Sequence, residues 1–101
     1  MAAFEVDTRM VQQTASELRQ MNSRFQRQVN DLDSSKRSLD SKWDGEANEA
    51  FNRSFMEDKG YMNQFYNVIQ QYCQALDAIV REYNDAERRT SQIARERTAR
   101  K

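Results

Sequence analysis

The sequence predicts an all-α protein, an antiparallel hairpin of two long helices, on the strength of three observations. The chain contains no proline, so no residue forces a helix to end. Its apolar residues recur every seven residues in two blocks, which is the period of helices that pack side by side. Gly45 lies between the blocks, and a short connection makes successive helices run in opposite directions.

The first block predicts a helix over about residues 7–42. Asp7 is placed to cap its N-terminus, and Val6 and Val11 are spaced as a hydrophobic staple. A single apolar ridge follows the helix at seven-residue spacing: Val11, Leu18, Phe25, Leu32 and Leu39. The opposite face is polar, so we expect this helix to bury one side only.

The second block predicts a helix over about residues 46–90, with Asp44 available as its cap. It carries two adjacent apolar lines, which are Phe55, Met62, Ile69, Leu76 and Tyr83, and then Phe51, Phe65, Tyr72, Ile79, Ala86 and Ile93. Asp58 interrupts the second line once. Gly60 falls on the solvent side, where it costs the helix about 1 kcal/mol and leaves packing intact.

This apolar surface is wider than one neighbouring helix can cover. Left exposed, it would form a larger apolar patch than soluble monomers usually carry. The sequence therefore predicts that two hairpins pack into a four-helix bundle, most simply as a two-fold homodimer. We expect the core and the dimer interface to be formed by the ridge of the first helix together with Phe55, Met62, Phe65, Ile69, Tyr72, Leu76 and Ile79.

The composition argues against enzymatic activity. The 101 residues include no histidine, one cysteine and two glycines, so histidine-based catalysis, a thiolate zinc cage and a glycine-rich phosphate loop have no candidate residues. We therefore expect no metal or cofactor. No apolar run is long enough for a membrane span or the apolar core of a signal peptide. Cys73 is expected to be a small apolar residue at a helix interface, with an intermolecular disulfide after export as the alternative.

A motif lies between the two blocks, almost at mid-chain. Trp43 falls on a core-facing shoulder of the first helix, and Gly45 permits the tight turn that follows. Ala47 allows close approach of the helices, and Phe51 begins the apolar line of the second helix. The motif thus reads Trp43-x-Gly45-x-Ala47-x-x-x-Phe51.

With this motif and the heptad blocks, the chain resembles the WXG-hundred (early secreted antigenic target-like) family of type VII secretion substrates over nearly its whole length. The resemblance implies a hairpin that dimerises into an antiparallel four-helix bundle, and an association with virulence. It also implies secretion without a cleaved signal peptide, driven by an FtsK/SpoIIIE-type ATPase. A family export signal, Tyr-x-x-x-Asp/Glu near the C-terminus, is matched by Tyr83 and Glu87. The alternative for this pair is a core tyrosine followed by an exposed glutamate.

The formal net charge of zero conceals two opposite charges. Residues 88–101 hold six basic side chains and one acidic one, whereas the rest of the chain is net acidic. Three interpretations are open for this basic tail. It is a solvated helix end whose cations suit the helix dipole, a contact for an acidic receptor or anionic lipid near the translocation machinery, or a nucleic-acid contact. The last has least support, because no groove-reading motif accompanies the charge.

Two alternatives to a homodimeric secretion substrate remain at this stage. The hairpin could be a targeting partner or chaperone that forms a heterodimer with a larger secreted toxin carrying a related helical domain. It could also be an intracellular helical adaptor that uses its basic tail. No nucleic-acid partner is expected under the main interpretation.

Overall fold

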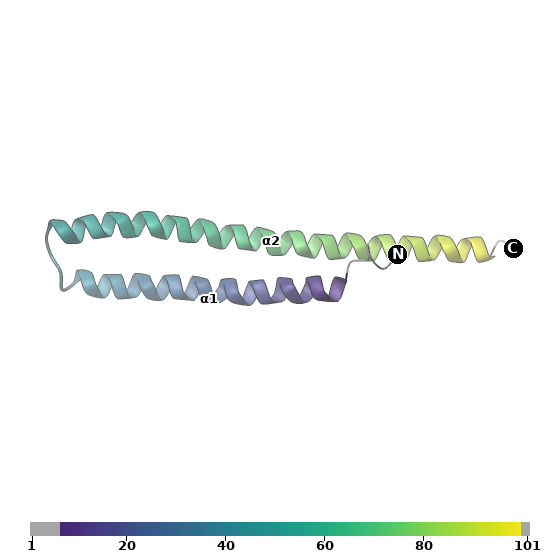
Figure 1. Ribbon diagram of the computed structural model, residues 1–101, viewed down its shortest axis with the longest axis horizontal. Helices are drawn as coiled ribbons and strands as arrows, with labels where there is room; N and C mark the ends of the chain where they lie inside the picture. The colour runs from purple at the N-terminus through teal and green to yellow at the C-terminus, as the bar shows by residue number, and fades with distance from the viewer. Residues whose placement is uncertain (1–6, 100–101) are drawn as a thin grey trace.

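The computed structural model describes residues 7–99 as two long antiparallel helices joined by a short turn (Figure 1). Helix α1 is Thr8–Asp40 and helix α2 is Glu46–Ala99. No strand occurs among these residues, so the predicted all-α hairpin is confirmed. Val6, Arg100 and Lys101, to which the sequence analysis assigned roles, lie outside the described residues.

Helix α1 begins where the capping residue predicts. The Asp7 side chain accepts hydrogen bonds from the backbone N–H groups of Arg9 and Met10 at 3.1 and 3.2 Å. These bonds satisfy two of the donors that an α-helix leaves free at its N-terminus. At the other end, the Ser41 hydroxyl donates to the Ser38 carbonyl at 2.7 Å, and the helix ends at Asp40 rather than at about residue 42.

Gly45 makes the turn. Its φ of +107° is a conformation that residues with a side chain rarely adopt. Its carbonyl accepts the backbone N–H of Glu49 at 3.1 Å, so Gly45 rather than Asp44 occupies the N-cap position of α2. Glu46 and Glu49 follow in the first turn of the helix, where the helix dipole favours negative charge.

Helix α2 is longer than the sequence analysis expected. It runs to Ala99 rather than to about residue 90, so the basic tail is helical as far as it is described. No glycine or proline follows Gly60, and the side-chain pairs Arg88–Asp85 and Gln92–Glu96, each about one turn apart, support the last turns. The hydroxyls of Thr90 and Thr98 each donate to the carbonyl four residues earlier, at 3.0 Å.

The different helix lengths leave the end of α2 unpaired. Ala15 lies against Cys73, whose Sγ is 3.8 Å from the Ala15 carbonyl oxygen, so the start of α1 lies near residue 80 of α2. Beyond this level α2 projects past α1 as a single helix (Figure 1). The molecule is a rod of 85 × 21 × 17 Å. Its core is the narrow seam between the helices, where the buried apolar residues are Ala15, Val29, Phe55, Cys73 and Val80.

Candidate functional site

The Trp-x-Gly turn is held by a row of aromatic rings. Trp43, half-buried, lies with its ring centroid 5.8 Å from that of Phe51. Phe51 in turn lies 6.2 Å from Phe55, which is buried in the seam. The turn that Gly45 permits thus carries the indole onto the first two turns of α2. Ala47 is exposed in the hairpin.

The seam between the helices follows the seven-residue line of α1 that leads to Trp43, beside the predicted ridge. On α1 the buried residues are Ala15, Asn22 and Val29, one seven-residue step apart. The predicted ridge lies along one edge of this seam, and Leu32 and Leu39 remain 45% and 42% exposed. On α2 the line that contains Phe55 and Met62 does face α1, but Phe65, Tyr72 and Ile79 lie outside the seam.

Asn22 is a polar residue in this seam that the sequence analysis did not single out. It is 3% exposed, and its Nδ2 donates to the backbone carbonyl of Tyr66 at 3.1 Å. Its Oδ1 is buried without a hydrogen-bond partner, as are the Oδ1 atoms of Asn48 and Asn52. The signal that could have revealed the seam is the seven-residue line Ala15, Asn22, Val29, Lys36 and Trp43.

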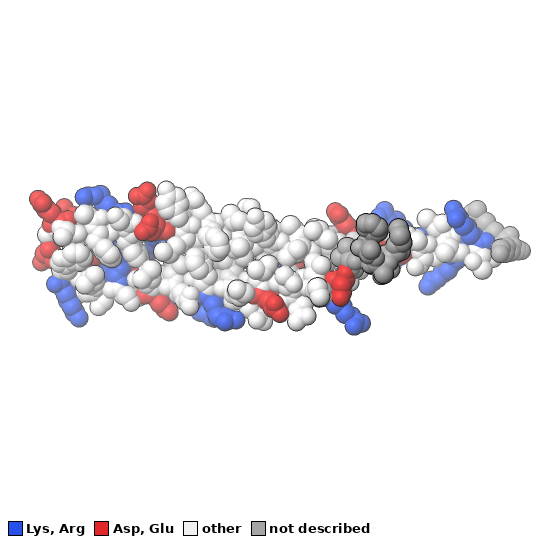
Figure 2. Space-filling model, viewed as in Figure 1, with Lys and Arg blue, Asp and Glu red and all other residues white. Residues whose placement is uncertain are grey.

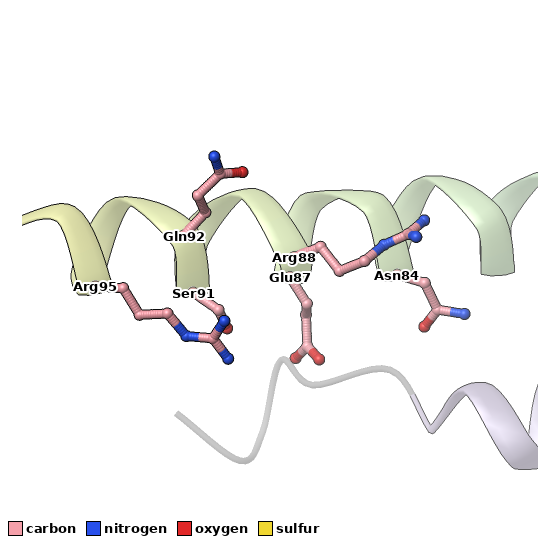
Figure 3. A pocket seen from close by; sticks show the side chains of 6 residues that line it. All are labelled: Asn84, Glu87, Arg88, Ser91, Gln92 and Arg95. Carbon is pink, nitrogen blue, oxygen red and sulfur yellow. The ribbon is translucent and has the colours of Figure 1, made fainter.

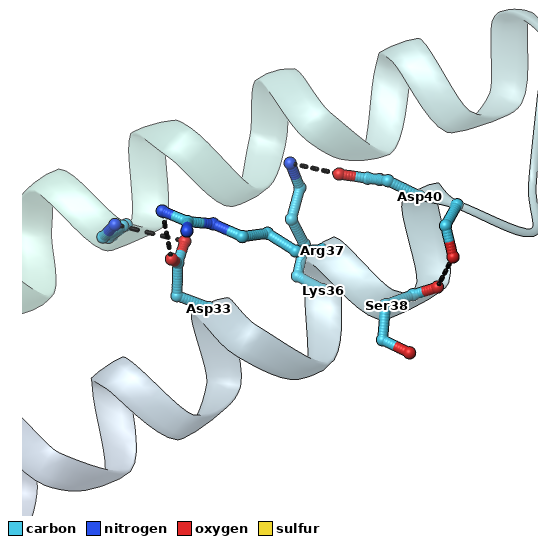
Figure 4. A network of polar contacts seen from close by, with 7 residues as sticks. Asp33, Lys36, Arg37, Ser38 and Asp40 are labelled. Carbon is cyan, nitrogen blue, oxygen red and sulfur yellow. Dashed lines mark hydrogen bonds and ion pairs between the residues drawn. The ribbon is translucent and has the colours of Figure 1, made fainter.

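One edge of the seam is closed by ion pairs between the helices. Arg19 pairs with Asp77, and Asp33 pairs with Lys59 at 3.1 Å. Within α1, Asp33 also pairs with Arg37 at 3.0 Å, and Lys36 pairs with Asp40 at 2.7 Å (Figure 4). We call this side of the hairpin the charged edge.

These contacts shift two ionisation equilibria. The hydrogen bond from Lys59, reinforced by the charges of Arg37 and Lys36, lowers the pKa of the Asp33 carboxyl. The hydrogen bond to Asp77 raises the pKa of Arg19. Both shifts favour the charged forms, so the charged edge holds its ion pairs at neutral pH.

The other edge of the seam is apolar and uncovered. Here Phe25 of α1 and Phe65 of α2 pack edge to face, with their ring centroids 5.4 Å apart. Phe65, Tyr72 and Ile79 are 54%, 59% and 48% exposed. We call this side the apolar face, and its large residues are Leu18, Phe25, Leu32 and Leu39 of α1 and Phe51, Phe65, Tyr72 and Ile79 of α2.

The charge distribution follows the long axis of the rod. On the face drawn in Figure 2, uncharged side chains cover most of the middle of the two helices, and charged side chains gather towards the turn and along the projecting part of α2.

Tyr83 and Glu87 lie one turn apart on α2, at the level where α1 begins. Tyr83 is half-buried and Glu87 is exposed. Glu87 also lines a shallow, polar depression on the projecting helix with Asn84, Arg88, Ser91, Gln92 and Arg95 (Figure 3). Arg88 pairs with Asp85 on the same helix. A groove on another protein can bind an aromatic ring and a carboxylate at this spacing at the same time.

Residues 7–99 contain no group of three or more side chains suited to hold a metal ion. Within the same range, neither helix is long and apolar enough to cross a membrane. The geometry thus offers surfaces for binding, namely the apolar face, the turn and the projecting helix.

Comparison with known protein families identifies the family to which a chain with this arrangement belongs. The family described as proteins of 100 residues with WXG (WXG100) matches residues 3–88, a range that includes α1, the Trp43-x-Gly45 turn and α2 as far as residue 88. The chain belongs to the WXG100 family. WXG100 proteins are small helical substrates of type VII secretion systems, and they generally pair with helical partners. No curated protein and no solved structure showed significant similarity to this WXG100 chain.

Proposed function

We propose that this WXG100 protein is a non-enzymatic type VII export substrate that is secreted as a folded dimer of hairpins. The observation that carries the proposal is the uncovered apolar face on a chain whose family membership is established. Export as a folded unit requires that this face be covered before the protein reaches the membrane, because an exposed apolar strip on a rod of this kind favours aggregation.

A second copy of the chain is the simplest cover. A single hairpin has one layer of helices, so many of its large apolar side chains stay exposed. Phe65 and Tyr72 are more than half exposed although they continue the heptad pattern of the core. Two hairpins that pack through this face form four helices around a shared core, as in other helical bundles. Met62, Ile69 and Leu76, which lie between the seam and this face, would be covered on both sides.

The export signal in this proposal is the pair Tyr83 and Glu87. Tyr83 is half-buried at the level where α1 begins, whereas Glu87 is exposed where α2 starts to project beyond α1. A receptor that binds the projecting helix would therefore reach Glu87 directly. By family resemblance, the receptor is the FtsK/SpoIIIE-type ATPase of the secretion system, and the basic residues that follow would extend the contact.

Export of variants tests the signal. We expect Tyr83→Ala and Glu87→Ala each to abolish most of the protein in the culture medium while the cellular level stays near that of the wild type. The matched control is Glu82→Ala, an exposed glutamate on another face of the same turn. Immunoblots of medium and cell fractions give the readout, with circular dichroism to confirm that the variants fold. Normal secretion of both Tyr83→Ala and Glu87→Ala would remove the signal assignment.

A heterodimer is the second candidate, because the same uncovered face could meet a related helical domain of a larger secreted toxin. The molar mass in solution separates the two. A homodimer gives twice the chain mass of 12.0 kDa in light scattering, whereas a chain that needs another partner stays monomeric or aggregates. A monomer at micromolar concentration would therefore favour the heterodimer.

A further inference from the structure

One charged residue stands in the apolar face. Along α2 the line at seven-residue spacing reads Phe51, Asp58, Phe65, Tyr72, Ile79, and all five are exposed in the hairpin. Within the described part of the chain, neither the Asp58 carboxylate nor the Tyr72 hydroxyl takes part in a hydrogen bond or an ion pair. A carboxylate in this position has to find a donor when the face is covered, because an unpaired buried charge is costly.

The apolar face has a centre that both helices share. The part of the α2 line that lies alongside α1, from Phe51 to Ile79, is centred on Phe65, and Ala86 and Ile93 continue the line only beyond the start of α1. The ridge on α1, from Val11 to Leu39, is centred on Phe25. These two central phenylalanines are in contact, with their ring centroids 5.4 Å apart. The two lines therefore extend to similar distances on either side of one point on the rod.

We propose that the second copy covers this face about a two-fold axis through the level of Phe25 and Phe65, and that its Tyr72 hydroxyl donates to Asp58. The inference rests on the dimer proposed above and adds its register and a polar contact across the interface. In this arrangement the two hairpins point in opposite directions, with α2 of each copy over α2 of the other. Phe65 then meets Phe65 of the second copy, and Phe51 meets the second copy's Ile79.

A two-fold axis at Phe65 determines that Asp58 pairs with Tyr72, because the two residues lie at equal distances from Phe65 along α2. At 1.5 Å per residue, seven residues span about 10.5 Å of helix. Asp58 lies one such step from Phe65 towards the turn, and Tyr72 lies one step away in the other direction. A two-fold axis at Phe65 that reverses the helix direction brings Asp58 to the level of the second copy's Tyr72, and symmetry repeats the pair.

The other simple arrangement leaves Asp58 without this donor. If the axis ran along the rod, the two turns would lie together and α2 of each copy would cover α1 of the other. Lys59 is level with Asp33 in the hairpin, so Asp58 would then face the second copy's α1 near Leu32. Covering the carboxylate with leucine would cost binding free energy, whereas a phenol–carboxylate hydrogen bond is among the stronger kinds.

The pair would give the interface specificity. The remainder of the face is aliphatic and aromatic, and such surfaces tolerate sliding and exchange of partners. A carboxylate that is satisfied in one register only disfavours the others. It also disfavours other hairpins that lack a donor at the level of Tyr72.

A double-mutant cycle on dimer dissociation tests the pair. Tyr72→Phe leaves two carboxylates unpaired, and we expect the dissociation constant to rise on the order of 100-fold, about tenfold for each bond. In an Asp58→Leu background the same Tyr72→Phe change should alter it by less than about threefold. The matched control is Tyr61→Phe, which removes a hydroxyl of similar exposure (61%) from the flank of the face and should change little. Equal effects of Tyr72→Phe in both backgrounds would overturn the inference.

Disulfide trapping tests the register independently. In a Cys73→Ala background, the double variant Asp58→Cys/Tyr72→Cys should oxidise to a covalent dimer, whereas each single variant should not. The two positions are 14 residues apart on one helix, about 21 Å, which is too far for an intrachain disulfide. A dimer in solution that gives no crosslink with the double variant, or gives it equally with the single variants, contradicts the register and leaves the dimer standing. A monomer contradicts both.

Discussion

Asn22 occupies a position in the seam that an apolar residue would fill at lower cost. Its amide makes one hydrogen bond, to the Tyr66 carbonyl at 3.1 Å, and its Oδ1 is buried without a partner. A buried polar group that is half satisfied destabilises the fold but restricts the ways in which two helices can slide past each other. Asn22 therefore favours one alignment of α1 on α2 at the expense of stability.

We expect Asn22→Val to raise the free energy of unfolding by about 1 kcal/mol, because it replaces an orphaned acceptor with an apolar side chain. Urea denaturation followed by circular dichroism measures the change. Asn30→Val, the same substitution at an exposed position of α1, should change stability by less than about 0.5 kcal/mol. Destabilisation by Asn22→Val well beyond that of Asn30→Val would show that the single hydrogen bond outweighs the unpaired oxygen.

The charged edge makes stability depend on pH through Asp33. Its pKa is lowered in the folded state, chiefly by the hydrogen bond from Lys59, so the unfolded chain binds a proton more readily than the folded one. The stabilisation is thus complete above the unfolded-state pKa of about 3.9 and is lost as the pH falls through the lower folded-state value.

We therefore expect wild-type Tm to fall on acidification below about pH 4 more steeply than that of Asp33→Asn, with the two profiles parallel at higher pH. Thermal melts between about pH 2 and 7 measure this difference. Asp31→Asn removes an exposed carboxylate two residues away and serves as the control. A profile of Asp33→Asn as steep as that of Asp31→Asn would contradict the role of Asp33.

At the scale of the helices, the same substitution is expected to have opposite effects on stability at Gly45 and at Gly60. Gly60 lies in α2 with nothing within 4 Å of the place where a Cβ would stand, and Gly45 has the same free space but a φ of +107°. The surroundings are therefore equal, and only the backbone conformation differs. A side chain stabilises a helical position relative to glycine and strains a left-handed one.

Gly60→Ala should raise the free energy of unfolding by about 0.5–1 kcal/mol, whereas Gly45→Ala should lower it by about 1 kcal/mol or more. Chemical denaturation of the two variants under the same conditions gives both numbers. Because the substitution is identical, each variant is the control for the other. Stabilisation at both positions would mean that the turn does not depend on the conformation of Gly45.

The helices could be predicted from sequence because their causes are local. The heptad blocks, the Asp7 cap and the Gly45 turn each act within a few residues, and the structure confirms the hairpin they predict. Which seven-residue line forms the seam could not be deduced in this way. Ala15, Asn22 and Val29 look weaker than the ridge of Val11 and Leu18, but small residues let the two helix axes approach closely.

The sequence pattern also did not predict that α2 continues beyond residue 90. The end of a helix without proline or glycine is set by weak side-chain pairs one turn apart, such as Gln92 with Glu96, which carry no strong pattern. Some parts of the candidate site could be predicted from the sequence and others could not. The turn motif and the Tyr83/Glu87 pair stand out in the sequence, whereas the division of the apolar residues into a seam and an exposed face needs the packing of one helix on the other.

At the scale of the whole molecule, one rod presents two unlike long sides. The charged edge joins α1 and α2 through Arg19–Asp77 and Asp33–Lys59, and the side chains there are already paired. The apolar face makes contacts within the hairpin, as between Phe25 and Phe65, but most of its large side chains remain exposed. Association through one side would therefore bury apolar surface without breaking the ion pairs of the other.

A pair of matched substitutions tests this asymmetry. Phe65 and Met56 both lie on α2 and are 54% and 60% exposed, but Phe65 is on the apolar face and Met56 is on the side of the charged edge. In an isolated hairpin, Phe65→Asp and Met56→Asp both place a charge at a position that is more than half exposed, although Phe65→Asp also removes the ring contact with Phe25. In the proposed dimer only Phe65→Asp buries an unpaired charge, at the two-fold axis, where it also meets its own copy.

We expect Phe65→Asp to weaken the dimer at least about 100-fold, since burying unpaired charge costs several kcal/mol, and to abolish the concentration dependence of Tm that dimerisation produces. Met56→Asp should keep both the mass and the Tm of the wild type, as light scattering and melts at several concentrations would measure. Equal behaviour of the two variants would place the interface elsewhere on the rod.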